Sequence, residues 1–338
     1  MKKLKISPKN KLIISLTSFA LLIVLILINL ITSPSQPSKN TTESIPLPQP
    51  TTFFKSPNQF IWEIDLLKLP DTIDTISTKP NTQAEAILNN LAAKLNFTNK
   101  STTIPNTPLI VFNNQPEATT IYLNTDDLTI QFSFDLLSKP SLNDTNIKSV
   151  DQINQDTLTL LNNSLNLPAT LTLTKTSTQY QTTNGPRFIN TTPENAKLVK
   201  STYGYTFNSL PILFPNGNSI ETIHALSGKP IKFTINLPPN SVQIQSTYNT
   251  KSIEEIKATP QDQFTTFMLK GNDRFELSDQ EIDIETATIT NGFLGYLNNK
   301  TQNTLDPMIF LTGTIKHNQY GQLEILLGIP ALSPSSYN

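Results

Sequence analysis

The chain contains no cysteine in its 338 residues. This absence excludes disulfide bonds, thiolate metal sites, cysteine nucleophiles and a lipidated N-terminal cysteine. A domain that lies outside the cytoplasm must then be stabilised by its core alone. Such a domain is more typical of a bacterial envelope protein than of a eukaryotic secreted protein.

Charge is also scarce, because charged residues make up only 15% of the chain, against about 25% in an average soluble protein. The net charge is -1, but five lysines precede residue 12, so the remainder has 20 basic and 26 acidic residues. Phosphate binding needs a basic patch, so this balance argues against nucleic acid as a partner. The hydrophobic content of 37% is enough for a folded core.

Residues that commonly carry catalysis are few. The two histidines, His224 and His317, have no set of neighbouring ligands that predicts a metal site, and we expect both to be surface residues. The chain has no G-x-S-x-G nucleophile turn, no phosphate-binding glycine loop and only ten glycines. We therefore expect no catalytic, cofactor-binding or metal-binding residues.

One acidic pattern leaves two interpretations open. Glu281, Asp283 and Glu285 alternate with Ile282 and Ile284. Three carboxylates on one strand face can bind calcium through oxygen. The same alternation is typical of a solvated strand face opposite a buried isoleucine face, and we favour this second interpretation.

The longest apolar run lies near the N-terminus, where residues 12–31 read LIISLTSFALLIVLILINLI. Twenty uncharged residues are long enough to span a bilayer as a helix. The basic residues 1–11 predict a cytoplasmic N-terminus with the bulk of the chain extracytoplasmic. A cleaved signal peptide is the alternative, but the run is long and no small-residue cleavage site follows it. We expect a cell-membrane anchor that contacts lipid through residues 12–31.

Composition divides the rest of the chain. Residues 32–58 are rich in Pro, Ser and Thr and predict a polar stalk. An N-terminal extracytoplasmic lobe is expected over 59–145 and a C-terminal lobe over 146–332, with a tail at 333–338.

Hydrophobic spacing predicts helices at 81–97, 149–167 and 258–272, and alternation predicts strands over most other segments. Helices segregated from antiparallel strands indicate the α+β class, with each sheet packed by a helix. Two or three diverged copies of one helix-plus-strands unit are expected, at 82–137, 150–214 and 259–330.

The C-terminal half carries turn and strand motifs with a recognisable order. A strand ending in SLPI is followed by strands, the segment PQDQFTTFMLKG, the segment GFLGYL and a closing GQLEILLGIPAL. Over about residues 150–332 this order resembles the YycH/YycI-like extracytoplasmic regulators of a sensor histidine kinase, and the broader PepSY-like envelope domains. The matching residues are Leu294, Gly295, Tyr296, Leu305, Pro307, Gly313, Pro330 and Ala331.

This resemblance implies a non-enzymatic regulatory or binding module that acts on another membrane or envelope protein. Two alternatives remain: a structural or adhesive protein that binds wall glycan or peptide, and an envelope hydrolase whose site the sequence does not reveal. The candidates for a partner surface, or for the strands that support it, are Pro211, Asn216, Gly217, Leu294, Tyr296 and Pro307.

Overall fold

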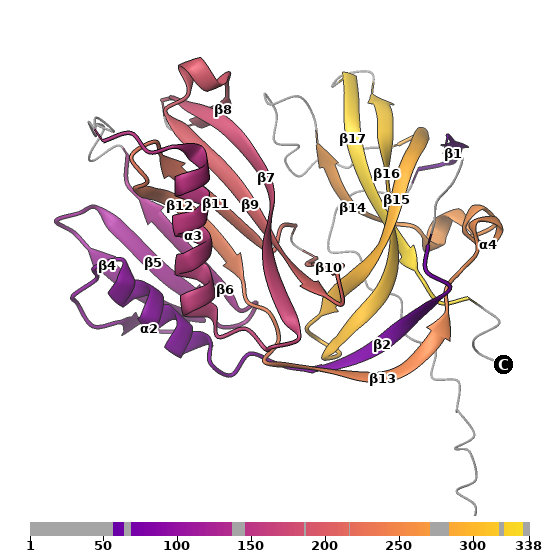
Figure 1. Cartoon of the computed structure of the whole chain (residues 1–338), viewed down its shortest axis with the longest axis horizontal. Coiled ribbons are helices and arrows are strands. Elements are labelled where there is room, and N and C mark those ends of the chain that lie inside the picture. The colour runs from indigo at the N-terminus through magenta and orange to yellow at the C-terminus, as the bar shows by residue number, and fades with distance from the viewer. Residues whose placement is uncertain are drawn as a thin grey trace, which may run out of the picture. The chain divides into compact units, whose positions relative to one another are not determined.

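A computed structural model describes residues 57–63, 69–136, 146–185, 187–215, 217–270, 284–317 and 321–333 (Figure 1). All of them belong to one compact unit, Leu47–Asn338. The expected membrane helix at 12–31 lies outside the described residues, and so do residues 32–56 of the stalk expected at 32–58. Within the described part, none of the helices has both the length and the apolar content that a membrane crossing requires.

The expected α+β class is wrong, because the described residues are mostly β-sheet. They contain seventeen strands and only three α-helices, one of which is a single short turn of chain, α4 (Ile253–Lys257). Two brief 3-10 turns, Pro193–Asn195 and Gln261–Gln263, complete the helical content.

A first group of strands forms an antiparallel sheet in which each strand pairs with the next one named. In spatial order the strands are β3 (Thr102–Thr103), β4 (Leu109–Asn114), β5 (Thr119–Asn124), β6 (Thr129–Phe134), β12 (Pro230–Asn236), β11 (Ile220–Ala225), β9 (Leu198–Phe207), β7 (Leu171–Asn184) and β8 (Arg187–Asn190). Because β6 pairs with β12, segments on both sides of residue 145 share this sheet.

Two helices pack on this sheet, α2 (Ala84–Lys94) against β5 and α3 (Val150–Leu165) against β7 (Figure 1). The helices also contact each other, since the Lys94 ammonium donates to the Asn163 carbonyl at 2.8 Å. α3 begins at Ser149, whose hydroxyl accepts from the Gln152 N–H at 3.1 Å, and it ends at Asn166 in the left-handed conformation.

The core under α2 is an aromatic and aliphatic row that crosses the sheet. Phe112, Ile121, Phe132 and Phe233 are direct partners on successive strands, and all are buried. Phe132 stacks on Phe233 at 4.9 Å between ring centroids. Phe97, just after α2, meets the Phe112 and Phe132 rings edge-on.

A second group of strands is built around β15 (Thr286–Asn299) and β16 (Thr304–His317), which pair antiparallel over almost their whole length. The strands that extend it are β17 (Gly321–Pro330) and β14 (Thr265–Lys270) beyond β16, and β1 (Gln59–Trp62) and β10 (Leu210–Leu213), which both run parallel to β15. β10 also pairs with β9, so it joins the two groups of strands.

The predicted third helix, at 258–272, is also wrong. Its residues form the 3-10 turn Gln261–Gln263 and the strand β14, which pairs with β17. Phe264, Phe267 and Met268 suggested a helical face, but Thr265, Thr266 and Phe267 favour a strand when a sheet edge is available. Phe264 and Thr266 are buried on one side of the strand, and Phe267 packs against Phe310.

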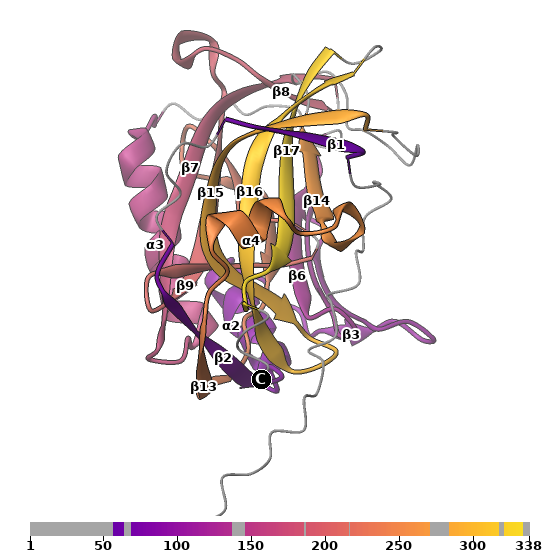
Figure 2. The ribbon, with the colours of Figure 1, turned by 90° about the vertical axis from the view of Figure 1, so that its right-hand side faces the viewer.

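The remaining pair, β2 (Thr72–Lys79) and β13 (Ser241–Asn249), forms an antiparallel ribbon. The two strands run side by side in both views (Figures 1 and 2). β2 continues into the second group of strands through its pairs with β16, Ser77 with Thr304 and Ile76 with Leu305. β13 is therefore the outermost strand of this ribbon among the described residues. At its end the Asn249 carbonyl accepts from the Ser333 N–H at 3.0 Å, beside the isolated bridge between Thr250 and Leu332, so the open part of its outer edge is the part before Asn249.

Candidate functional site

The densest buried polar network lies between α3 and the sheet. The inward face of α3 presents Asn154 and Thr157 as well as apolar residues, and both are buried. The Ser201 hydroxyl on β9 donates to Asn154 Oδ1 at 2.6 Å. The Tyr203 hydroxyl reaches the same amide oxygen at 3.4 Å. Hydrogen bonds thus join α3 to the strands beneath it.

His224 belongs to this network and is not the surface residue that we expected. It lies on β11 at a register shift between Ile223 and His224, and only 6% of the residue is exposed. Its Nε2 atom is 3.4 Å from Thr157 Oγ1. Because the Thr157 hydroxyl donates to the Ile153 carbonyl at 2.7 Å, we assign Nε2 as the protonated nitrogen that donates to Thr157.

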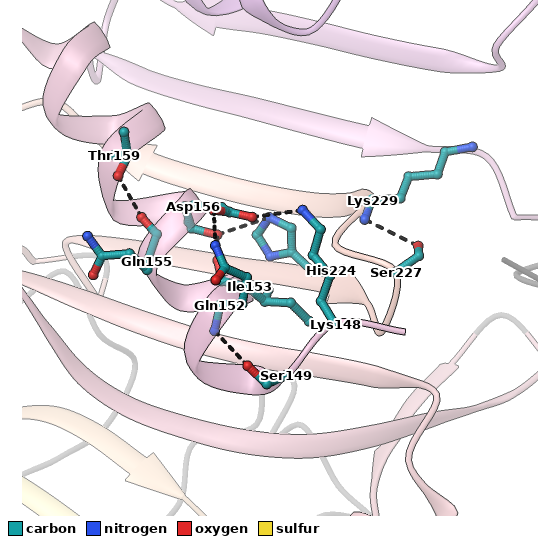
Figure 3. Close-up of polar contacts among 11 residues, drawn as sticks. Lys148, Ser149, Gln152, Ile153, Gln155, Asp156, Thr159, His224, Ser227 and Lys229 are labelled. Carbon is teal, nitrogen blue, oxygen red and sulfur yellow. Dashed lines mark hydrogen bonds and ion pairs between the residues drawn. The ribbon is translucent and has the colours of Figure 1, made fainter. Parts of the chain in front are cut away.

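Burial lowers the pKa of His224 to about 4, and the nearby Lys148 ammonium lowers it in the same direction. The imidazole is therefore neutral at pH 7. Figure 3 shows the imidazole beside the side chain of Lys148, the residue just before the Ser149 cap of α3.

Lys148 and Asp156 form an ion pair at the surface above His224, with 2.8 Å between Nζ and Oδ2. The Gln152 amide donates to the other carboxylate oxygen at 2.7 Å. These hydrogen bonds, first the one from Lys148 and then the one from Gln152, lower the pKa of Asp156. Lys148, just before α3, and Gln152 on α3 thus bond both oxygens of the Asp156 carboxylate. The carboxylate therefore orients Lys148 and not the His224 imidazole.

The geometry around His224 and Thr157 fits a structural role better than a role in nucleophilic catalysis. A hydroxyl nucleophile needs a base that can take its proton and a third group that orients the base. Here the Thr157 proton is directed to a backbone carbonyl of its own helix. The described residues also contain no cluster of three or more His, Cys, Asp or Glu side chains that could hold a metal ion.

Three of the six residues singled out from the sequence lie in the β15–β16 pairing. Leu294, Tyr296 and Pro307 are buried, and Tyr296 is the direct partner of Pro307. The Tyr296 ring meets Phe207 of β9 at 6.0 Å. These three residues hold strands together and offer no surface to a partner.

The other singled-out residues lie nearer the surface. Pro211 is half-buried on β10, with its carbonyl 2.8 Å from where a Cβ on Gly295 would lie. Gly217 is exposed with φ +109°, and Asn216 lies outside the described residues. Of the acidic pattern near residue 283, the described part shows Ile284 buried and Glu285 exposed.

The surface feature that the sequence did not single out is the outer edge of β13. Its nine residues, SVQIQSTYN, carry no charge and no proline, and five consecutive residues, Gln243–Thr247, are exposed. Ile244 is 48% exposed. The sequence does show an uncharged strand between Pro238-Pro239 and Ser252, the cap of α4. The alternation of apolar and polar residues, however, does not distinguish an edge strand from a central one.

An apolar row ends at this edge. Leu305 on β16 faces Ile76 on β2, and Ile76 faces Ile244 on β13. Leu305 and Ile76 are at most 1% exposed, whereas Ile244 is half open. Among the described residues, the row is covered at its inner end and left uncovered at Ile244, its outer end.

Comparisons with family models, with curated proteins and with solved structures find no match to this chain.

Proposed function

We propose that this chain is a membrane-anchored, extracytoplasmic, non-catalytic module that binds or regulates another envelope protein, and that it binds through the outer edge of β13. The observation that carries the proposal is the uncharged, exposed edge of β13, at which the apolar row ends in Ile244. An extended segment of a partner would add one strand there and cover the isoleucine.

Edge strands normally carry features that discourage such pairing. Lysines, prolines, inward-pointing charges and bulges are the usual ones. β13 has no lysine, proline or charge, but it has a bulge at Gln245, between Ile244 and Ser246. The bulge limits the regular edge to its first half, Ser241–Ile244, and so supports a short, specific contact over open-ended aggregation.

The rest of the proposal rests on the sequence. The apolar run 12–31 and the lysines before it support a bilayer anchor, and the acidic balance beyond it supports a protein partner over nucleic acid. The resemblance to YycH/YycI-like regulators supports a role exerted by contact. The neutral His224 agrees with that role, since its hydrogen bond to Thr157 joins β11 to α3.

The test is site-specific photo-crosslinking of the full chain in its native membranes. A crosslinker at Ile244 should capture one defined envelope protein. The matched control is Ile104, an isoleucine that is also exposed, at 39%, but lies after β3. Equal capture from both positions, or capture from Ile104 alone, would show that β13 is not the binding edge.

A further inference from the structure

The backbone groups that β13 offers to a partner follow from its register. The Thr78 N–H donates to the Asn303 carbonyl at 2.8 Å, so it points away from β13. Backbone groups alternate in direction along a strand, so Ser77 and Lys79 point toward β13 and bond their register partners Gln243 and Ser241. Val242 and Ile244 therefore direct their N–H and C=O groups to the open edge.

These two residues form a self-complementary pair. In an antiparallel pairing with the two-fold axis at Gln243, Val242 of one chain faces Ile244 of the other, and the reverse. Both lie on the same face of β13 as Ile76. Each exposed isoleucine would be covered by a valine, and about four interstrand hydrogen bonds would form between the outward groups.

We infer that a second copy of this chain is an occupant of the β13 edge, in an antiparallel β13–β13 pairing centred on Gln243. The inference rests on the proposed function, because it adds regulation to the same edge. A copy paired in this way masks Val242 and Ile244 from any other partner. Self-association and binding of another envelope protein then compete.

Two observations favour this register over its neighbours. An axis at Ile244 would bring Val242 opposite Ser246, but Ser246 lies beyond the bulge, where its register partner is Thr75 and its backbone groups point inward. The edge also carries no charge, so two identical strands meet without like-charge repulsion. Antiparallel two-fold contacts place the same patch on both subunits, as this requires.

The absence of cysteine allows a direct test by disulfide formation in the full-length chain, in membranes. Gln243→Cys places one thiol at the axis, where directly opposed residues of a non-hydrogen-bonded pair have Cα atoms about 4.5 Å apart, within disulfide range. Gln245→Cys is the matched control: the same exposed residue type, but with copies separated by more than about 10 Å along the strands.

Mild oxidation should shift Gln243→Cys from 37.6 kDa to twice that mass, and leave Gln245→Cys at the single-chain mass. Adding Ile244→Lys to Gln243→Cys should abolish the shift, whereas adding Ile104→Lys should not. Equal dimer from both cysteine variants, or none from either, would overturn the pairing. Photo-crosslinking to a different protein from Ile244 would survive that result, so the two proposals fail separately.

Discussion

His224 shows how one buried side chain ties the stability of this protein to pH. Its folded-state pKa is about 4, below the value of about 6.5 expected in an unfolded chain. Between these values the unfolded chain binds a proton that the folded chain does not. Stability therefore falls as the pH drops through this window and is unaffected above it.

The first prediction follows from that difference. The free energy of unfolding should fall by about 3 kcal/mol more between pH 6.5 and pH 4 in the natural chain than in His224→Gln, which keeps an N–H donor but cannot be protonated. Urea unfolding at several pH values measures it. Carboxylates such as Asp156 also titrate in acid, but both proteins share them. Parallel pH profiles would show that folding does not lower the pKa of His224.

At the scale of elements, β15 and β16 approach each other closely at a glycine. A Cβ on Gly313 would lie 2.0 Å from the Thr288 carbonyl oxygen, beside a register shift between Ile289 and Asn291. Backbone cannot move away from a central strand pairing without breaking neighbouring hydrogen bonds. The close approach fixes this position as glycine.

Gly313→Ala should therefore destabilise the fold by about 3 kcal/mol or more. The control is Gly204→Ala, where the atom that an added Cβ would meet is a side-chain methyl, of Thr176 at 3.1 Å, and not backbone, and where we expect a change of about 1 kcal/mol or less. Thermal or denaturant unfolding of the two variants gives the comparison. A mild effect at Gly313 would mean that the two strands are less tightly paired than described.

The same elements show how far local pattern predicts structure. The spacing of Ile87, Leu88 and Leu91 and of Ile153 and Leu161 predicted α2 and α3, because a helix buries one face at that spacing. It misled at 258–272, where neighbouring β17 supplied hydrogen bonds that only a strand can use. The α+β prediction was wrong for the same reason. Because residues 265–270 form β14 and not a helix, the group of strands around β15 and β16 lacks the covering helix that was expected.

At the scale of the whole molecule, the decisive contacts join segments that are far apart in sequence. β1 pairs with β15, β2 pairs with β13 and β16, and β10 joins β9 to β15. Alternation predicts that each segment is a strand but does not predict its partner. For that reason the sequence analysis proposed Leu294, Tyr296 and Pro307 as candidates, although they are buried between strands. It did not identify Ile244, which is exposed because β13 lies at an edge.

Binding by strand addition at β13 is the central claim, and amide hydrogen exchange tests it most directly. The Val242 and Ile244 amides should exchange quickly in the detergent-purified monomer, since they face the open edge. In isolated native membranes, with a partner strand paired there, exchange at these two amides should slow by at least about tenfold, as expected for a gain of roughly 1.4 kcal/mol in local protection. Unchanged exchange at Val242 and Ile244, together with new protection elsewhere on the described surface, would contradict the account.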